Sequence, residues 1–553
     1  MRRAHSALVA TGLGLALVVA PGCGGGERSG FEDPAQDNAS TDPTSDPSGA
    51  GRGAFGGDAT QTLVLDPKNT TVIIDSATSP PTPGAVTYTL SKDGADLAAG
   101  ATFTLKDGSL GTFNGATFTS VPSLPAGVLG KSTTVQVQTD KGQALGTLTV
   151  VQLRKTGAQR DFFFVVPYGE APSPKSDVLE FSTNIKQADV AFVMDTTGSM
   201  SLAIDNLKSA LQGTLMAQLQ AAIPNVGLAV VDYKDFGDPW VVKVNQVVTT
   251  NLGLAKAGVA LMSAAGGGDT PEAQIAAMQF TLLGQANDVI GAHANATPGT
   301  FGGVDFRPGS VPVVVNITDA DWHDPSGNAT MTTLKAAFSS TKARFVNIAE
   351  SSLFFGAGPE GKANELSDAT GSNVPASAFG TVSGCSAGQC CTGSGGAGRA
   401  PSGPGGSCRL NFLSQGGNGV SSGIVKAIEA IAVGSTFDVT ATASNDPNNP
   451  GGVDATKFIK ALRAMNEGSP ASGCPAAAAR DSNGDGVKDT FVGVKAGTPV
   501  CFEVIPQTNA TVLPQLEPQF YSAFVDVIAL EGNLHLDQRS VLFLVPPKDA
   551  DVK

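Results

Sequence analysis

The spacing of hydrophobic and polar positions divides the chain into two kinds of segment. Over residues 61–155, short alternating runs such as TLVLD, VTYTL and TTVQVQT are separated by turn residues, which is typical of a β-sandwich. Over residues 188–434, near-continuous apolar runs such as VAFVM, VGLAVVDY and VPVVVNITD alternate with helical spacing, for example from Ile204 to Leu219. Because strands covered on both faces read as continuous apolar runs, this alternation predicts a doubly wound, Rossmann-like parallel sheet.

Strand patterns return in the C-terminal part of the chain, in TFDVTATAS, TPVCFEVIP and SVLFLVPP. The run DFFFVVP, ahead of the α/β segment, has a residue pattern similar to that of SVLFLVPP. We therefore expect residues 156–187 and 435–553 to contribute strands to one second β-sandwich, with the α/β segment inserted between them. The predicted fold class is multidomain, α/β plus all-β.

Composition and charge narrow the class of partner. A chain of 553 residues is long enough for about three domains. The net charge of −14 and the absence of a basic patch argue against nucleic-acid binding. An excess of carboxylates suits a protein that holds hard divalent cations.

The N-terminus predicts export. Two arginines precede an apolar run from Ala7 to Ala20, which is too short to span a membrane and is followed by Pro-Gly-Cys. Residues 1–23 resemble a bacterial lipoprotein signal, which implies lipidation of Cys23; an ordinary secretory signal is the alternative, since Ala20 stands where Leu or Val is usual. Residues 24–60 are almost devoid of apolar side chains and predict a disordered linker. We expect an exported protein of the bacterial cell envelope, an outer-membrane lipoprotein or surface protein, whose membrane contact is the lipid anchor alone.

Six cysteines remain after Cys23, and export makes disulfides their expected state. We expect Cys474 to pair with Cys501. Four more lie in a Gly/Ser-rich insertion over residues 381–410, and we expect them to pair among themselves. Zinc is the alternative, but two adjacent cysteines and the absence of paired CxxC spacing disfavour it. The four are Cys385, Cys390, Cys391 and Cys408.

The loop after the first apolar strand of the α/β segment reads DTTGSMS, with Asp195, Thr197 and Ser199 at alternate positions. An extended turn with this spacing points three oxygens into one crevice, and oxygen ligands are those that Mg²⁺ prefers. Open α/β sheets bind ligands at the carboxyl ends of their strands, where this loop would lie. The alternative is that Asp195 is an ordinary strand-end turn residue.

DTTGSMS resembles the metal-ion-dependent adhesion site of von Willebrand factor A domains, and VPVVVNITDA resembles the third metal loop of that family. The resemblance implies that Asp195, Thr197 and Ser199 are metal ligands and that Asp319 is the metal-proximal carboxylate. It also implies Mg²⁺ or Mn²⁺ as the cation, and a protein or extracellular-matrix ligand that presents an acidic group.

The second metal loop departs from the usual pattern of that family. Members often read Gly-Gly-Thr-x-Thr, whereas this chain reads AAGGGDTPEA, with Gly268 in place of the usual threonine. Either Asp269 or Thr270 then supplies the oxygen ligand. The alternative is that one of them caps a helix whose first residue is Pro271.

Two further resemblances concern architecture. The run from TLVLDPKNTTVIID to GTLTVVQL is similar to bacterial Ig-like domains of group 2, which implies Ig-like sandwiches beside the A-type domain. An A-type domain inserted in a sandwich is similar to the hybrid arrangement of integrin β-subunits. Those subunits carry paired acidic residues for a neighbouring Ca²⁺ site, where this chain has Leu202 and Ala203, so no such neighbour is predicted.

A second cation site is suggested within residues 481–492, where DSNGDGVKDT resembles the calcium loops of EF-hands, dockerins and thrombospondin type 3 repeats. Val492 replaces the usual acidic residue at the twelfth position, so we expect a structural Ca²⁺ clip between strands. A polar Asx-rich turn is the alternative. The implied ligands are Asp481, Asn483, Asp485, the carbonyl of Val487, and Asp489.

The function predicted from these features is surface adhesion through a metal-bridged acidic contact. The alternative is a structural component of the envelope in which metal only stabilises the fold. An enzyme is not expected, because no Ser/His/Asp, Cys/His or phosphate-loop arrangement occurs and the chain has only four histidines. His323, just past Asp319, is interpreted as an exposed loop residue beside the site and not as a catalytic base.

Overall fold

The computed structural model describes residues 63–548, except residues 77, 154, 157–158, 352–359, 381–382 and 532. The predicted signal with Cys23 and the predicted linker lie outside the described residues. The described chain combines an α/β segment with β-rich segments on either side of it. No helix in the described part of the chain has both the length and the apolar character needed to cross a membrane.

The first described segment, from Val64 to Gln152, is built from three small sheets. Burial alternates along its ninth strand, Gly130–Thr139, so that one face packs into the core and the other faces solvent. The sheet orders are β1-β4-β5, β2-β10-β9-β6 and β3-β8-β7, and a short hairpin of β11 (Lys155–Thr156) and β12 (Gln159–Arg160) follows. The strands are β1 (Val64–Asp66), β2 (Asn69–Ile74), β3 (Ala85–Thr87), β4 (Thr89–Lys92), β5 (Ala95–Asp96), β6 (Thr102–Leu105), β7 (Gly111–Asn114), β8 (Thr117–Ser120), β9 (Gly130–Thr139) and β10 (Gly142–Gln152).

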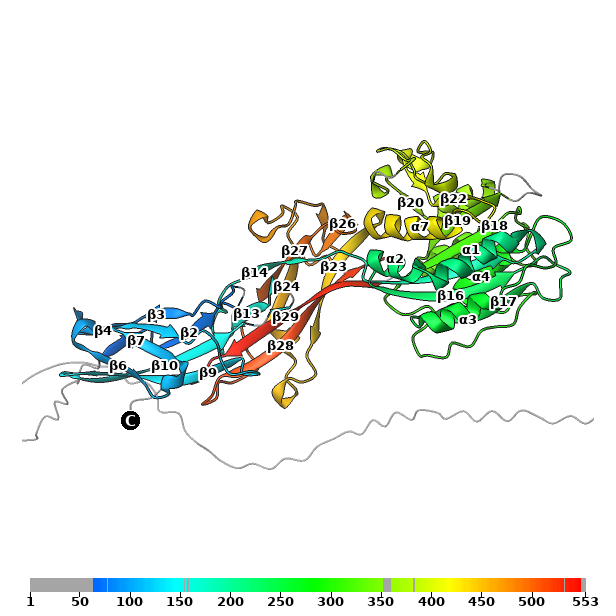
Figure 1. Ribbon diagram of the computed structural model, residues 1–553. Coiled ribbons are helices and arrows are strands. Elements are labelled where there is room, and N and C mark those ends of the chain that lie inside the picture. The colour runs from blue at the N-terminus through cyan, green and yellow to red at the C-terminus, as the bar shows by residue number, and fades with distance from the viewer. Residues whose placement is uncertain are drawn as a thin grey trace, which may run out of the picture. The chain divides into compact units, whose positions relative to one another are not determined.

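A second β-rich segment takes strands from both sides of the α/β segment. β13 (Phe162–Val165) pairs in parallel with β29 (Leu534–Val545), and β14 (Asp177–Phe181) pairs antiparallel with β27 (Val500–Pro506). The chain therefore leaves these sheets after β14 and returns to them at β23 (Figure 1). The two sheets have the orders β13-β29-β28-β23-β26-β25 and β14-β27-β24. The other strands are β23 (Thr436–Asn445), β24 (Ile459–Ala464), β25 (Ala479–Arg480), β26 (Thr490–Lys495) and β28 (Gln519–Ala529).

The α/β segment has one six-stranded sheet in the order β17-β16-β15-β18-β19-β22, parallel except for the edge strand β17. Every residue of β18 is buried, as are all but the first of β15, because helices cover both faces. The strands are β15 (Gln187–Asp195), β16 (Asn225–Tyr233), β17 (Val242–Thr249), β18 (Val311–Thr318), β19 (Arg344–Ser351) and β22 (Asn411–Gln415).

Alternate residues of β15 pack into two separate cores. Val190 and Phe192 lie in the core shared with four helices, whereas Ala191 and Val193 lie in the core shared with three others. The first set comprises α1 (Ser201–Gln212), α2 (Leu215–Ala222), α3 (Leu252–Ala260) and α7 (Val420–Gly434), and the second α4 (Gln274–Leu283), α5 (Met331–Thr341) and α6 (Gly361–Ala369).

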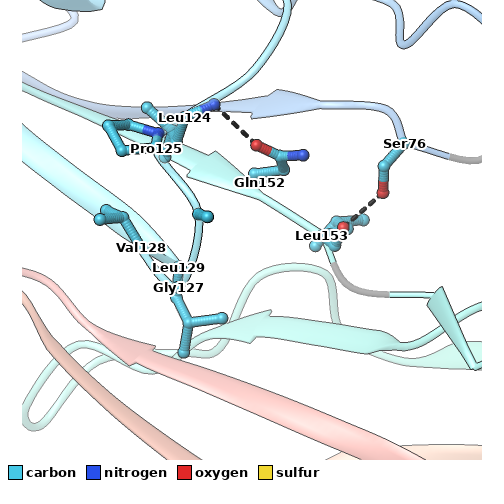
Figure 2. A pocket seen from close by; sticks show the side chains of 9 residues that line it. Ser76, Leu124, Pro125, Gly127, Val128, Leu129, Gln152 and Leu153 are labelled. Atoms are coloured by element: carbon cyan, nitrogen blue, oxygen red, sulfur yellow. Dashed lines mark hydrogen bonds between the residues drawn. The ribbon is translucent and has the colours of Figure 1, made fainter.

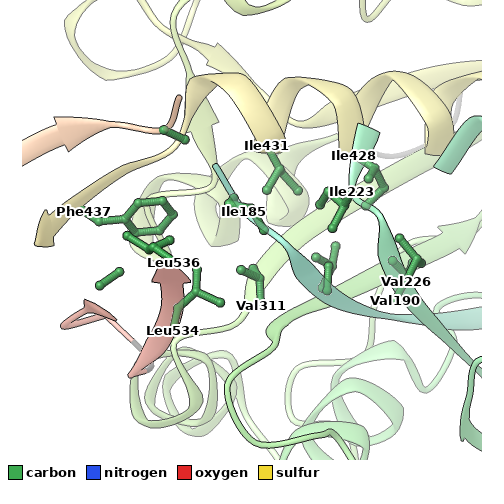
Figure 3. Packing of buried hydrophobic residues seen from close by; sticks show 14 of the residues in the cluster. Ile185, Val190, Ile223, Val226, Val311, Ile428, Ile431, Phe437, Leu534 and Leu536 are labelled. Carbon is green, nitrogen blue, oxygen red and sulfur yellow. The ribbon is translucent and has the colours of Figure 1, made fainter. Parts of the chain in front are cut away.

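The helical pattern from Ile204 to Leu219 is divided between α1 and α2, because the first helix ends with Gly213 as its C-cap. The apolar core beneath these helices continues past the amino ends of the strands. There Ile185 and Val311 lie in the same cluster as Phe437 and Leu534 of the second β-rich segment (Figure 3). The amino ends of the strands are therefore packed against the second β-rich segment. We expect a binding site on this sheet at the carboxyl ends of the strands instead.

The described residues form three disulfides. Cys474 pairs with Cys501, as predicted. The four clustered cysteines pair among themselves, which confirms the prediction and decides a pairing that the sequence left open. The bonds join Cys385 to Cys391 and Cys390 to Cys408.

Candidate metal centre

The candidate metal-binding residues lie where three neighbouring parallel strands end. Asp195 is the last residue of β15, Tyr233 is the last of β16, and Thr318 is the last of β18. Because these strands are adjacent and in register at this end, the loops that follow them meet at one edge of the sheet. This edge is where open α/β sheets place their ligands.

Four of the predicted ligands are brought together by hydrogen bonds. Oδ1 of Asp195 accepts from the backbone N–H of Thr197 (2.9 Å) and from its hydroxyl (2.7 Å). The Ser199 hydroxyl donates to Oδ1 of Asp319 (3.1 Å), and the Thr318 hydroxyl donates to Oδ2 of Asp195 (2.7 Å). The first and third loops thus form one cluster of carboxylate and hydroxyl oxygens.

The Asp195 carboxylate is fully buried in this cluster. Burial raises its pKa to about 6, and the nearby Asp319 carboxylate acts in the same direction. Hydrogen bonds from Thr197 and Thr318 oppose that shift without cancelling it. A positive charge beside Asp195 would therefore relieve an unfavourable concentration of negative charge.

The second-loop residues predicted as candidate ligands lie at the surface, and the structure corrects only their alternative role as a helix cap. Asp269 and Thr270 are both exposed, and helix α4 begins only at Gln274 with Ala273 as its N-cap, so neither residue caps it. The side chain of this loop that is buried beside the first loop is Glu272, which is 2% exposed. The sequence DTPEA predicts the first turn of a helix. Nothing local in the sequence tells a residue of such a turn from one buried beside the metal loop.

Glu272 lies close to the first metal loop. Gly267 has a φ of +72°, and a Cβ there would come within 2.7 Å of Thr197 Cβ and 3.1 Å of Glu272 Oε1. Only glycine fits this gap. Oε2 of Glu272 is buried and has no hydrogen-bond partner among the described residues.

Burial raises the pKa of Glu272 to about 9, and neighbouring carboxylates add to the shift. An unpaired buried carboxyl oxygen is costly unless a cation or a proton satisfies it. The environment of Glu272 is therefore suited to a cation. The contributing carboxylates are those of Asp195, Asp235, Asp238 and Asp319.

The metal loops are fixed to one another through their backbones. The second loop pairs with the first on one side and with the third on the other, and the first is also tied to the end of β16. These bonds join the three loops into one hydrogen-bonded cluster. They run from Ala265 N to Thr196 O (3.0 Å), Gly198 N to Gly266 O (3.0 Å), Glu272 N to Asp321 O (2.8 Å), His323 N to Glu272 O (2.9 Å) and Thr196 N to Tyr233 O (2.9 Å).

His323 forms part of the rim of this cluster. Its Nε2 lies 2.9 Å from Oδ1 of Asp235, and its ring meets Phe236 edge-on at 5.3 Å between centroids. The side chain is 30% exposed, so it is less free than the predicted loop residue. The Asp235 carboxylate and the Phe236 ring therefore fix the orientation of the His323 imidazole.

The donor types fit a hard cation only when hydroxyl oxygens are counted. Within the described ranges, no three His, Cys, Asp or Glu side chains are grouped closely enough to hold a metal by themselves. The hydroxyls of Thr197 and Ser199 lie against the Asp195 and Asp319 carboxylates and complete an oxygen-only set. Such a set matches the preference of Mg²⁺ or Mn²⁺ and not that of softer metals.

The predicted calcium loop is an exposed turn between β25 and β26. Asp481 accepts backbone N–H bonds from Asn483, Gly484 and Gly486 at 3.2, 2.7 and 2.8 Å. These bonds lower the pKa of Asp481 and favour its charged form, and the bond from Gly486 has the largest effect. The same geometry serves a calcium loop and an Asx-rich turn, so Ca²⁺ binding here stays a prediction.

A cavity of about 420 Å³ in the first β-rich segment offers no second centre. It is lined by residues 124–129 with Ser76, Gln152 and Leu153 (Figure 2). Gln152 Oε1 accepts from Leu124 N at 2.7 Å, and Ser76 donates to the Leu153 carbonyl. None of the lining side chains is titratable, so this cavity lacks the carboxylates found in the loop cluster.

Comparison with known proteins identifies the class of domain that carries the cluster. Residues 189–288 match the family model of the von Willebrand factor A domain, so the chain contains a domain of this family. The matched range includes the first and second metal loops.

No curated protein matches the chain. Among solved structures, a pilus adhesin of Lactobacillus rhamnosus GG in an open conformation is similar, at 12% identity and a TM-score of 0.26. The likeness covers 89% of this chain and 50% of the adhesin, so the chain spans about half the length of that protein. At these values the likeness carries no argument about function.

Proposed function

We propose that the loop cluster binds Mg²⁺ or Mn²⁺ through oxygens of Asp195, Thr197, Ser199 and Asp319, with Glu272 as the ligand from the second loop. The single observation that carries this proposal is the buried Oε2 of Glu272, which has no hydrogen-bond partner among the described residues and feels the negative charge of Asp195 and Asp319. The negative charges of Asp195 and Asp319 disfavour ionisation of Glu272, and a cation among them would offset that repulsion.

The protein contributes a rigid cradle to this site. Thr318 fixes one oxygen of Asp195, and Thr197 fixes the other. The backbone bonds between the loops fix their spacing, so the ligand oxygens need little rearrangement when the cation enters. A bound Mg²⁺ or Mn²⁺ supplies positive charge at the surface, which a carboxylate of a partner can share.

On this basis the function that fits best is adhesion: the von Willebrand factor A domain engages a protein or extracellular-matrix ligand through that shared acidic contact. We place the protein at the bacterial cell envelope, exported by the N-terminal signal and anchored through Cys23. Labelling with a radioactive or clickable fatty acid tests the anchor, and labelled unaltered protein beside unlabelled Cys23→Ala is expected. Equal labelling of the two would contradict it.

Cation binding is tested by titration calorimetry of the folded protein with Mn²⁺, comparing the unaltered chain with Asp195→Ala. Asp140→Ala is the matched control, since Asp140 is an exposed carboxylate in the turn between β9 and β10. We expect binding by the unaltered protein and by the control, and none by Asp195→Ala. Equal binding heats for all three would remove the basis of the proposal.

A capture experiment separates adhesion from a purely structural role. Immobilised protein is exposed to matrix and cell extracts with Mg²⁺ or with EDTA, and Asp195→Ala is run in parallel. Adhesion through the cation predicts partners that are retained with Mg²⁺ and lost with both EDTA and Asp195→Ala. Partners retained under all conditions would favour the structural role.

A further inference from the structure

Three asparagines form a buried row across the sheet of the α/β segment. Asn316 of β18 is the register partner of Asn347 in β19, and Asn347 is the register partner of Asn411 in β22. Their side chains are 0%, 0% and 2% exposed. We call these three residues the asparagine row. On β15 the same row continues with the apolar Val193, as expected for the interior of such a sheet.

The hydrogen bonds of the row all run in one direction. The Tyr233 hydroxyl donates to Oδ1 of Asn316 (3.1 Å), and Nδ2 of Asn316 donates to Oδ1 of Asn347 (2.8 Å). Nδ2 of Asn347 then donates to Oδ1 of Asn411 (2.9 Å). Hydrogen bonds aligned in this way polarise and strengthen one another in a buried setting. An aliphatic residue at each position would fill a parallel sheet without needing any partner, so the amides call for an explanation beyond packing.

One end of the row reaches the disulfide-rich insertion. Nδ2 of Asn411 donates to Oε1 of Glu360 (3.3 Å), whose two oxygens accept from Nη1 and Nη2 of Arg399 at 2.9 and 3.2 Å. Arg399 is held by a pair of 2.8 Å backbone bonds with Cys390, which is itself joined to Cys408. Residues 383–410, with their two disulfides, are termed the stapled loop.

The other end of the row reaches the metal centre. The backbone carbonyl of Tyr233 accepts two hydrogen bonds from Thr196, one from its N–H (2.9 Å) and one from its hydroxyl (3.1 Å). Thr196 stands between Asp195 and Thr197 in the first metal loop. The Tyr233 hydroxyl fixes the ring to the row while the carbonyl of the same residue fixes the loop.

We propose that the asparagine row positions the first metal loop and couples it to the stapled loop, so that the contact between Arg399 and Glu360 sets the cation affinity of the metal centre. The inference rests on the proposed function, because it assumes that the centre binds a cation. Asn316, Asn347, Asn411 and Glu360 are positioning residues in this account, and none of them touches the cation. Partners of ligand side chains typically change metal affinity by about tenfold or more, and a smaller effect is expected for a longer chain of contacts.

The decisive variant is Glu360→Gln, at a half-buried position whose side chain is 27% exposed, so the fold is expected to tolerate it. Glu365→Gln is the matched control. It makes the same change within helix α6, whose N-cap is Glu360, and Glu365 pairs there with Lys335 at 2.5 Å, outside the row. We expect Glu360→Gln to raise the Mn²⁺ dissociation constant roughly threefold to tenfold, and Glu365→Gln to leave it unchanged. Thermal midpoints measured on the same samples separate this effect from general destabilisation.

A second variant tests whether the effect travels through the row. Asn347→Leu interrupts it at the centre, and in that background Glu360→Gln is expected to have no further effect on the dissociation constant. If Asn347→Leu does not fold, the comparison of Glu360→Gln with Glu365→Gln decides alone. Equal dissociation constants for Glu360→Gln and the unaltered protein would overturn the coupling while leaving the proposed function intact. A lack of Mn²⁺ binding by the unaltered protein would overturn both.

Discussion

The hydroxyl of Thr318 donates a 2.7 Å hydrogen bond to Oδ2 of Asp195, and so ties together the carboxyl ends of β18 and β15. The same hydroxyl accepts from Nε2 of Gln274 and from the N–H of Ala320, both at 3.1 Å. One buried threonine thus orients the first metal-loop carboxylate, the third loop and the start of α4. In the proposed metal centre, such groups would pre-organise the ligands without themselves contacting the cation.

Thr318→Val tests this role with almost no change in volume. The variant loses the bond to Asp195 and removes the acceptor of the buried N–H of Ala320, which costs roughly 1–3 kcal/mol in the free energy of unfolding. We also expect the Mn²⁺ affinity to fall by about tenfold. Denaturant titration and calorimetry measure the two effects, and Thr318→Ser, which keeps the hydroxyl, is the control. A Thr318→Val protein with unchanged stability and affinity would rule out the orienting role.

The identity of the second-loop ligand is tested by two matched amide substitutions. Glu272→Gln removes the charge of the buried carboxylate, and we expect it to weaken Mn²⁺ binding by more than about tenfold. Asp269→Asn changes an exposed carboxylate three residues earlier, and we expect little effect on binding. Calorimetry on both variants provides the comparison. The opposite ranking would favour Asp269, one of the two second-loop ligands predicted from the sequence.

Stability at low pH is predicted to depend on Asp537. Burial disfavours the charged form of the Asp537 carboxylate. Hydrogen bonds from Ser182 N–H (2.8 Å) and Lys186 Nζ (2.9 Å) favour that form more strongly, so the pKa of Asp537 is lowered. A pKa below the unfolded-state value of about 3.9 means that the charged form stabilises the fold above that pH. The contribution is lost as the pH falls through the folded-state pKa.

The measurement is the free energy of unfolding against pH for the unaltered protein and Asp537→Asn. We expect the variant to be less stable by roughly 1–3 kcal/mol at neutral pH. The gap is expected to narrow below about pH 4. Asp140→Asn, in an exposed turn, serves as the control. A gap that stays constant down to about pH 2 would show that the ionised carboxylate is not responsible.

The calcium-loop prediction is tested by thermal unfolding with and without Ca²⁺ in the Asp195→Ala background, which removes the contribution of the metal centre. Binding to the folded loop raises the unfolding midpoint by mass action. We expect such a rise, and we expect Asp481→Ala together with Asp485→Ala to abolish it. An unchanged midpoint on adding Ca²⁺ would identify the segment as an Asx-rich turn.

The parts of the candidate site that depend on local sequence pattern could be predicted from the sequence. Asp195, Thr197 and Ser199 stand at alternate positions after an apolar strand, and Asp319 follows another such strand, so their convergence follows from strand order. The pairing of Cys474 with Cys501 was likewise predicted and is confirmed.

The parts that escaped prediction depend on contacts distant in sequence. Glu272 is buried beside the first loop because its backbone pairs with Asp321 and His323, about fifty residues further along the chain. The edge strand β17 was missed because its residues are mostly half-buried and show neither a continuous apolar run nor a clean alternation. The asparagine row depends on the register of β18, β19 and β22, which no local pattern reveals.

The most direct test of the central claim is a crystal of the folded protein soaked in Mn²⁺ and measured for anomalous scattering. The account predicts an anomalous peak enclosed by oxygens of Asp195, Thr197, Ser199, Asp319 and Glu272, and its disappearance in Asp195→Ala crystals soaked in the same way. A well-ordered centre with no peak at this position, or a peak that persists in Asp195→Ala, would contradict it.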